Sequence, residues 1–334
     1  MKDLLVPSIL LLLYRWVPVE GFHHPNPLSY QTALFTSVER REFLESIGIA
    51  SVSLYAPTAV LAADDGTTDE TTGFDLKCLL DLPPKPSDCI RIYLCRHGQT
   101  ENNRLRIVQG RRVDAPLNSN GIEMAKRLGK TLANLEEPPS IMVHSPLLRA
   151  KQTAEIAAEQ LTAKPKFEVL ETISEVDFGP AVDGQPVSEA RSGMVKTYGA
   201  WSIGLIDTYP EGGGESGREV LQRSSSALRS LISLTNESQV GCIAAVAHST
   251  YLKILLAVLM EEPLAKASSR TLANASINVL DMKRDGSTTS IQGGSNLFGG
   301  TPLSRAPSNF KLKVPSGNVV RFNEDRHLRG ISLS

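Results

Sequence analysis

The sequence predicts an α/β fold, a three-layer sandwich with a central, mostly parallel sheet. Strand-like and helix-like segments alternate from residue 88 onward, which is typical of a sheet covered by helices on both faces. The segment 242–247 is wholly apolar, as expected for a central strand that is buried on both sides. The apolar strand 91–95 runs directly into Arg96, His97 and Gly98, at the strand end where such sheets place their chemistry.

The expected elements follow one another in a regular order. Strands are expected at residues 91–95, 140–144, 167–170, 242–247, 276–281 and 319–322. Helices are expected at residues 122–135, 147–161, 215–234 and 251–260. The first helix has apolar residues at helical spacing after a candidate N-cap at Asn118 or Ser119, and the other elements repeat the same strand–helix unit.

Two segments of different composition flank or interrupt these units. Residues 285–311 are rich in glycine, serine and threonine, and predict a flexible insertion between the last two strands. Residues 64–87 predict a linker, because they are acidic and threonine-rich at first and proline-rich at 82–86. A single folded domain is therefore expected over residues 88–330.

The first 21 residues resemble a secretory signal peptide. Lys2 precedes an apolar run that ends before Gly21, and the run is too short to span a membrane comfortably. We therefore expect no stable membrane anchor after processing. Residues 22–39 would then start at Phe22, which resembles the transit part of bipartite plastid presequences in algae.

A second signal is expected at residues 40–63. Arg40 and Arg41 precede a mildly apolar stretch that ends in Ala62 and Ala63, which resembles a twin-arginine signal for the thylakoid lumen. The two signals in series make residues 1–63 a targeting presequence and predict a plastid location, in the thylakoid lumen if the second signal acts. The alternative is an amphipathic helix with a chance arginine pair.

Charge and cysteine content exclude several classes of site. Lys+Arg number 35 and Asp+Glu 36, so nothing indicates nucleic acid as a partner. The four cysteines form no CxxC pair, which argues against a zinc site. Cys78 and Cys89 lie in a polar segment and are expected as free surface thiols, with a disulfide as the alternative in an oxidising compartment.

Five residues carry the predicted chemistry. His97 is the candidate nucleophile, since an imidazole nitrogen attacks phosphorus, and Arg96 beside it supplies the positive charge that such a transition state needs. Arg149, in the first turn of a helix, and His248, after the strand 242–247, add further phosphate-binding groups. Glu175 is the candidate general acid. Asp177 is a weaker candidate for that role, and Glu175 read alone is also consistent with an exposed loop carboxylate.

An ordered series of motifs resembles one known family. The matching pieces are Arg96-His97-Gly98-Gln99-Thr100 with Asn103, Gln109-Gly110, Asp114-Ala115-Pro116-Leu117 with Gly121, Ser145-Pro146 with Arg149-Ala150 and Gln152-Thr153-Ala154, Glu175 with Phe178-Gly179, Gly213-Gly214-Glu215-Ser216, Ala247-His248 and Asn323 with His327-Leu328. The series is similar to the histidine phosphatase superfamily, also called phosphoglycerate-mutase-like, and covers residues 91–328. The resemblance implies the phosphoglycerate-mutase-like fold.

The resemblance also implies roles for single residues. His97 is expected to be phosphorylated, Arg96, Arg149 and His248 to bind the phosphoryl group, and Glu175 to donate a proton and then activate water. Substrate contacts are expected from a further set, Asn103, Gln109, Gly110 and Ser249. No metal or organic cofactor is implied.

The chain departs from the family pattern at two places. Ser249 stands where the family often has glycine, although its amide is still able to donate to phosphate. Residues 178–184 are one residue longer than the family's FGxWEG segment and lack its tryptophan, which leaves the substrate rim at 180–201 unassigned.

These observations favour a phosphomonoesterase that acts on a small phosphorylated substrate through a phosphohistidine. The alternative is a cofactor-dependent phosphoglycerate mutase, but those enzymes typically read Glu-Arg-His-Tyr-Gly where residues 175–179 read Glu-Val-Asp-Phe-Gly. A third interpretation is a non-catalytic phosphate-binding module. The sequence assigns neither the substrate nor an oligomeric state.

Overall fold

The computed structural model describes residues 73–293, 297 and 309–331, so the predicted presequence, residues 1–63, lies outside the described residues. The helical elements are α3 (Glu101–Arg104), α4 (Ser119–Ala133), α5 (Leu148–Ala158), η2 (Glu171–Ile173), α6 (Val187–Ser202), α7 (Gly217–Glu237), α8 (Ser249–Leu259), α9 (Leu264–Ser269) and η4 (Arg326–Leu328). The strands are β1 (Cys89–Arg96), β2 (Ile141–His144), β3 (Lys166–Val169), β4 (Cys242–Ala247), β5 (Ile277–Lys283), β6 (Thr288–Gln292), β7 (Lys311–Pro315) and β8 (Gly317–Glu324).

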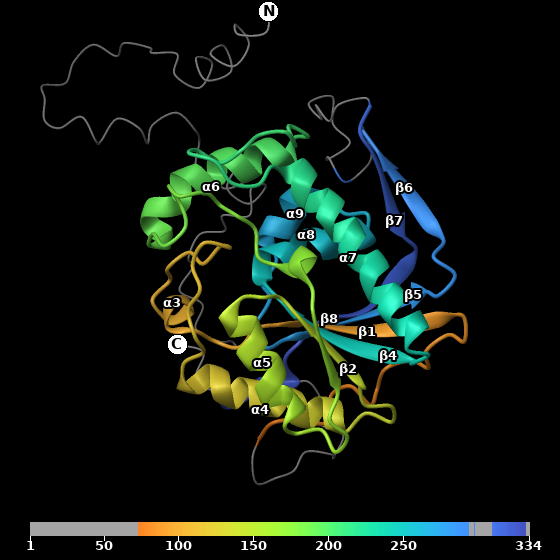
Figure 1. Ribbon diagram of the computed structural model, residues 1–334. Helices are drawn as coiled ribbons and strands as arrows, with labels where there is room; N and C mark the ends of the chain where they lie inside the picture. The colour runs from red at the N-terminus through yellow and green to blue at the C-terminus, as the bar shows by residue number, and fades with distance from the viewer. Residues whose placement is uncertain (1–72, 294–296, 298–308, 332–334) are drawn as a thin grey trace, which may run out of the picture. The chain divides into compact units, whose positions relative to one another are not determined.

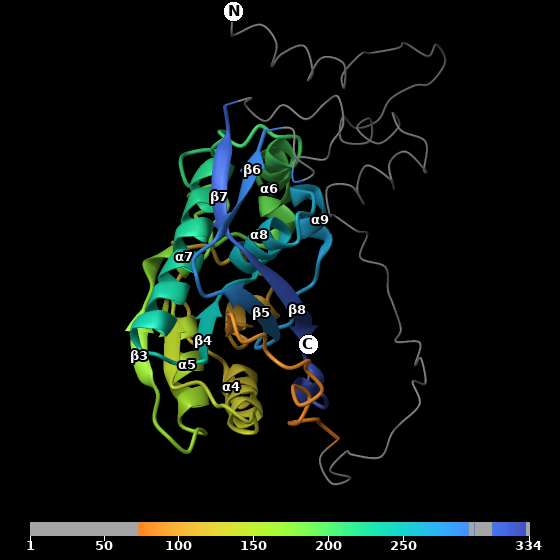
Figure 2. The same ribbon diagram turned by 90° about the vertical axis from the view of Figure 1, so that its right-hand side faces the viewer.

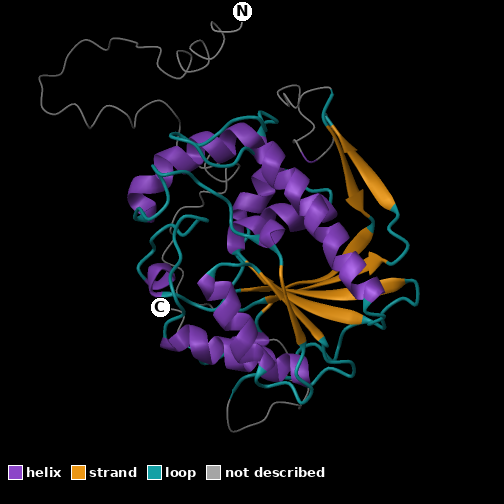
Figure 3. Cartoon of the chain, viewed as in Figure 1, coloured by secondary structure: helices purple, strands orange, loops and turns teal. Residues whose placement is uncertain are grey.

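The central sheet has the order β3-β2-β4-β1-β5-β8. Its first four strands run parallel, and β5 and β8 are antiparallel to their neighbours. Helices cover both faces, with α4 and α5 on one side and α7 and α8 on the other (Figures 1 and 3). The predicted α/β sandwich with a mostly parallel sheet is therefore confirmed.

Alternation along the strands divides the apolar side chains between the two helical layers. On β1, Ile92 and Leu94 face the α7 and α8 layer, whereas Tyr93 and Cys95 face α4 and α5. Successive side chains of a strand point to opposite faces, so one apolar strand builds both cores. Each face is packed independently, which holds the strand ends at fixed places.

Several elements were not expected from the sequence. Helix α6 contains Gly193 and Gly199, which weaken the helical signal, and it lies in the segment 180–201 that we left unassigned. Strands β6 and β7 pair as an antiparallel ribbon beside α7, as Figure 2 shows. Strand β6 falls inside the expected insertion 285–311, so that segment is in part ordered sheet, with residues 294–296 and 298–308 outside the described residues.

The linker prediction was wrong for residues 73–87. Cys78 is almost fully buried against the α4 and α5 face of the sheet, where the thiol acts as a small apolar group. Arg91 donates to the carbonyl of Pro83, and Arg326 donates to that of Cys78. The expectation of surface thiols was also wrong, because Cys78 and Cys89 are both buried, and both are free. Residues 64–72 lie outside the described residues.

Candidate active site

The register of two parallel strands brings His97 and His248 together. Arg96 lies opposite Ala247 in the β1–β4 pair, so the two histidines leave neighbouring strands at the same carboxyl edge. Their ring centroids are 5.2 Å apart, and both rings are buried. Adjacent strand ends thus place two buried imidazoles side by side, as expected for the site of an α/β sheet.

The ring of His97 is oriented by its own neighbour. Its Nδ1 lies 2.7 Å from the carbonyl oxygen of Gly98. A carbonyl only accepts, so Nδ1 carries the hydrogen and Nε2 keeps a lone pair. Burial, and then the positive charges of Arg149 and Arg96, hold the pKa of His97 well below its usual value of 6.5. The ring is therefore neutral at pH 7, which is the nucleophilic form.

Arg149 is fully buried in a cage of backbone carbonyls. Its guanidinium donates to the carbonyl oxygens of Val113, at 2.7 Å, Gln109, at 3.2 Å, and Gly110, at 3.3 Å. Its position in the first turn of α5 starts the side chain at the helix N-terminus, where positive potential suits an anion. The loop 109–113 therefore fixes the direction of this guanidinium.

Arg96 lies at the end of β1, and one of its terminal nitrogens donates to the carbonyl of Leu272 at 2.6 Å. Burial, with repulsion from Arg149, lowers its pKa to about 10, so the guanidinium stays charged at neutral pH. Two arginine cations are thus buried near each other, and among the described residues Glu175 is the one carboxylate whose charge raises the pKa of both.

Buried nitrogen atoms without partners occur on several residues of this site. Among the described residues, no hydrogen bond is made by Arg96 Nε, Arg149 Nε, Gln109 Nε2 or His248 Nδ1. Buried polar atoms are almost always paired, so such a group calls for an explanation. One oxyanion bound among them would accept hydrogen bonds and offset the arginine charges.

The ring of His248 is oriented by Ser145, whose hydroxyl oxygen lies 2.8 Å from Nε2. Burial, followed by the charge of Arg149, keeps the pKa of His248 well below 6.5. His248 also occupies the N-cap position of α8 without a side-chain capping bond. The first turn of α8 is therefore open to another acceptor.

Glu175 supplies that acceptor. Its Oε1 accepts the backbone N–H groups of Val176 and Tyr251, both at 2.9 Å, and its Oε2 accepts that of Thr250 at 3.1 Å. The side chain is almost fully buried, so the interpretation as an exposed loop carboxylate was wrong. Because Oε2 accepts one bond only, it retains a lone pair for a proton or a leaving group.

A partly buried ion pair fixes the segment that carries Glu175. Arg223 of α7 donates to the carbonyls of Thr172 and Ser174 and binds both carboxylate oxygens of Glu215. Its guanidinium also lies 4.6 Å from the ring centroid of Tyr251. Glu215, from the Gly213–Ser216 motif, thus helps to position the candidate acid.

Asp177, the weaker acid candidate, is occupied elsewhere. It pairs with Arg112 at 2.6 Å, and it accepts the backbone N–H of Gly179. The Arg112 hydrogen bond and charge hold the pKa of Asp177 low despite partial burial, which opposes them. A carboxylate held ionised in this way is unsuited to proton donation.

The remaining predicted contacts divide into two groups. The Nε2 of Gln109 is buried without a partner, and Ser249 begins α8 directly after His248, so donors of both remain available to a ligand. The Oδ1 of Asn103 instead accepts from Thr100 and Asn274, and the N–H of Gly110 donates to Asp183. These two residues therefore shape the site through contacts within the protein.

Three further residues organise the site. Thr153 accepts the N–H of Gly98 at 2.9 Å and donates to the carbonyl of Arg149. Ser145 contacts His248, and Asn274 bridges the carbonyls of His97 and Gly98. Ser145 and Thr153 belong to the motif series identified in the sequence, which gave neither residue a role. No local pattern marked Asn274.

Comparison with known proteins decides the family. The profile of the Histidine phosphatase superfamily (branch 1) matches residues 92–292. The chain belongs to this superfamily. The five candidate site residues, Arg96, His97, Arg149, Glu175 and His248, all lie inside the matched range.

Relatives within the superfamily carry different activities in their names. A probable phosphoglycerate mutase GpmB from Salmonella paratyphi C is 29% identical over 197 residues, which is 58% of this chain and 85% of the relative. The structure of a phosphoserine phosphatase from Entamoeba histolytica covers 72% of this chain and 99% of its own, with 21% identity and a TM-score of 0.52. A mycobacterial glucosyl-3-phosphoglycerate phosphatase covers 70% and 99%, with 22% identity and a TM-score of 0.51. The two structures support the fold.

Among the described residues, no three metal-binding side chains come together as a candidate metal site. The helices in the same part of the chain include none with the length and hydropathy of a membrane span.

Proposed function

We propose that this chain is a phosphomonoesterase that hydrolyses a phosphate ester through a phosphohistidine on His97. The observation that carries the proposal is the set of unpartnered buried nitrogens around the two histidines, which suits a bound phosphoryl group. The nitrogens belong to Arg96, Arg149, Gln109 and His248. A phosphoryl transition state spreads charge over its equatorial oxygens, and fixed cations and donors stabilise it.

The residues suit a two-step transfer. Nε2 of His97 attacks phosphorus, the ester P–O bond breaks, and its electron pair leaves on the substrate oxygen, which takes a proton from Glu175. The Nδ1–H group stays hydrogen-bonded to the Gly98 carbonyl oxygen, which stabilises the positive charge that the ring acquires. Water then attacks phosphorus, Glu175 takes its proton, the N–P bond breaks, and inorganic phosphate leaves.

Hydrolysis is favoured over mutase transfer by the residues beside Glu175. Val176 is buried in the apolar core, and Asp177 is paired with Arg112. Neither presents the cation that the corresponding mutase positions typically carry. The likeness to a probable phosphoglycerate mutase keeps transfer as a second candidate. Conversion of 3-phosphoglycerate to 2-phosphoglycerate in the presence of a bisphosphoglycerate primer would support it.

The test uses 4-nitrophenyl phosphate with the wild type and two histidine variants. His97→Ala is expected to lose at least about 10³-fold in kcat, because the nucleophile is gone. His144→Asn is the matched control, since His144 is another buried strand-end histidine whose Nδ1 contacts the next carbonyl, that of Ser145. Phosphate released equally by wild type and His97→Ala would exclude the mechanism. A phosphohistidine trapped without acid quench would exclude the non-catalytic binding module.

A further inference from the structure

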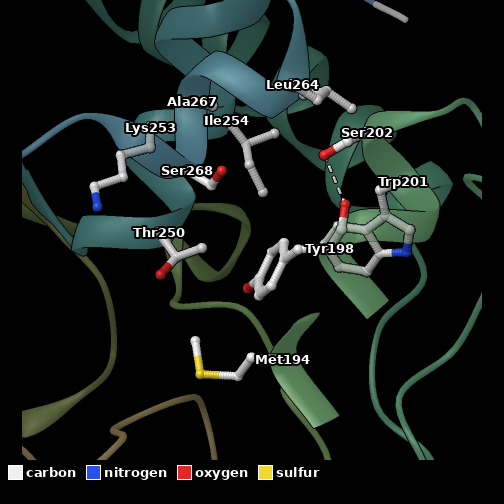
Figure 4. A pocket seen from close by; sticks show the side chains of 10 residues that line it. All are labelled: Met194, Tyr198, Trp201, Ser202, Thr250, Lys253, Ile254, Leu264, Ala267 and Ser268. Carbon is white, nitrogen blue, oxygen red and sulfur yellow. Dashed lines mark hydrogen bonds between the residues drawn. The ribbon is translucent and has the colours of Figure 1, made fainter. Parts of the chain in front are cut away.

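A cavity lies beside the α8 turn that holds the candidate acid. It measures about 110 Å³ and is bounded by α6, α8 and α9. Its lining residues include Met194, Tyr198, Trp201, Thr250 and Lys253 (Figure 4). Thr250 joins the cavity to the site, because its backbone N–H donates to Glu175. The leaving group of a substrate departs next to this carboxyl, so the cavity lies where that group would be held.

Most of the cavity wall is apolar. In Figure 4, Met194, Tyr198 and Thr250 point toward a common space, with Trp201 behind Tyr198. The rings of Tyr198 and Trp201 pack edge to face, with centroids 4.8 Å apart. The Tyr198 hydroxyl lies near Thr250 but makes no well-aligned hydrogen bond among the described residues. The wall therefore suits a compact carbon skeleton.

Lys253 supplies the positive charge at this wall. It follows Thr250 by one turn of α8 and extends on the Thr250 side of the cavity, opposite Trp201 (Figure 4). Among the described residues its ammonium group has neither an ion pair nor a hydrogen bond, although it is half-buried. Burial and repulsion from Arg96 lower its pKa to about 8, and the charge of Glu175 opposes that shift. A half-buried cation without a counter-ion is costly, and a bound anion would offset that cost.

We propose that this cavity binds the leaving group of the substrate, and that Lys253 recognises a second anionic group on it. The preferred substrate class is then a phosphate monoester of a small alcohol or phenol that also carries a carboxylate or a second phosphate. This inference rests on the proposed function, since it assigns the part of the substrate that the phosphoryl site does not hold.

The test compares esters that differ in charge and match in shape. The wild type is assayed with 4-carboxyphenyl phosphate and 4-carbamoylphenyl phosphate, whose leaving groups have nearly the same size. We expect the kcat/KM of the carboxylate ester to exceed that of the amide at least about tenfold, as for one charge-assisted contact. A 4-(phosphonomethyl)phenyl ester then separates a preference for carboxylate from one for a phosphate-like group.

Two lysine variants separate the role of Lys253 from a structural one. Lys253→Met keeps the carbon stem and is expected to bring the ratio of the two kcat/KM values to about one, whereas Lys253→Arg retains most of the preference. Lys130→Met, at an exposed position on α4, should leave the ratio as in the wild type. Circular dichroism melting checks that the variants fold, and Lys253→Met should melt no lower than wild type because it removes an unpaired charge.

The outcomes distinguish this inference from the proposed function. Equal kcat/KM values in the wild type, or an unchanged preference in folded Lys253→Met, would overturn the second anionic subsite and leave the phosphatase proposal standing. Release of phosphate from neither ester, nor from 4-nitrophenyl phosphate, would overturn both. Product binding gives a second readout: 4-hydroxybenzoate should inhibit the wild type more strongly than 4-hydroxybenzamide, and Lys253→Met should lose that difference.

Discussion

Glu175 is tied to the helix that follows His248 by a hydrogen bond from the backbone N–H of Tyr251 to its Oε1, 2.9 Å long. The same helix, α8, begins directly after His248. The candidate acid and one phosphate-binding group are thus fixed by the same helix terminus, although 73 residues of sequence separate Glu175 from His248.

The first prediction concerns this contact. Glu175→Gln should lower kcat by about 10²–10⁴-fold, because an amide can neither give a proton to the leaving oxygen nor take one from water. Gln keeps one carbonyl oxygen for the N–H groups, so the fold should persist with a loss of about 1–2 kcal/mol in the free energy of unfolding. Steady-state kinetics and urea unfolding measure the two effects.

Glu171→Gln is the control for that prediction, because Glu171 is an exposed carboxylate in the neighbouring η2 turn. Its kcat should stay within a factor of about two of the wild type, as for surface substitutions in general. A folded Glu175→Gln protein with more than half of the wild-type kcat would show that another group moves the proton.

Arg223 is expected to act through Glu175 as a positioning residue. Arg223→Lys removes the planar fork that binds Glu215 and the carbonyls of Thr172 and Ser174, and should therefore lower kcat about tenfold while KM changes less than about twofold. Arg229→Lys, at an exposed site on the same helix, is the control. Equal losses of kcat in both variants would contradict a positioning role.

The sequence predicted the central part of this site because the chemistry lies at strand ends. His97 and His248 each follow an apolar strand, and parallel pairing alone brings such positions to one edge. Arg149 was predictable from its place in the first turn of α5. These expectations depend on local pattern and on one topological rule.

Other parts depend on contacts between distant segments and left no local signal. The carbonyl cage of Arg149 comes from the loop 109–113, and Asn274 reaches His97 across 177 residues of sequence. Residues 73–87 look like a linker by composition, yet Cys78 packs into the core. Lys253 reads as the polar position of an otherwise apolar helix, and only the packing of α6 against α8 and α9 encloses it.

The third prediction concerns the charge state of the two site histidines. Burial and the neighbouring arginines hold the pKa of His97 and of His248 well below 6.5, so both rings should be neutral at pH 6 in the free protein. Imidazole ¹⁵N NMR should show the Nδ1–H tautomer for His97, since the Gly98 carbonyl accepts from Nδ1. Variants His97→Gln and His248→Gln assign the signals.

Binding of an oxyanion should reverse part of that shift. Vanadate would offset the charges of Arg96 and Arg149, whose repulsion helps to keep the imidazoles neutral. At pH 6 we therefore expect vanadate to raise the protonated fraction of His248. Two imidazolium signals from these residues at pH 6 before any ligand is added would contradict the electrostatic description of the site.

The last prediction uses His327, which lies outside the reacting groups. Its Nε2 is 3.1 Å from the carbonyl oxygen of Ala275, and burial is the main cause that lowers its pKa to about 4. In the unfolded chain the pKa is near 6.5, so between these values the unfolded state binds a proton that the folded state excludes. The contribution to stability is complete above pH 6.5 and is lost as the pH falls toward 4.

The expected slope is about 1.4 kcal/mol of unfolding free energy per pH unit for this one histidine. His327→Gln keeps a donor for the Ala275 carbonyl and removes the titration, so its stability should fall less steeply than that of the wild type between pH 6.5 and pH 4.5. Urea unfolding at half-unit intervals measures both curves. Above pH 7.5 they should run parallel, which is the internal control, because His327 is neutral there in both states. Curves that stay parallel down to pH 4.5 would mean that His327 is protonated in the folded protein at an ordinary pKa. The contact with the Ala275 carbonyl would then be accessible to water.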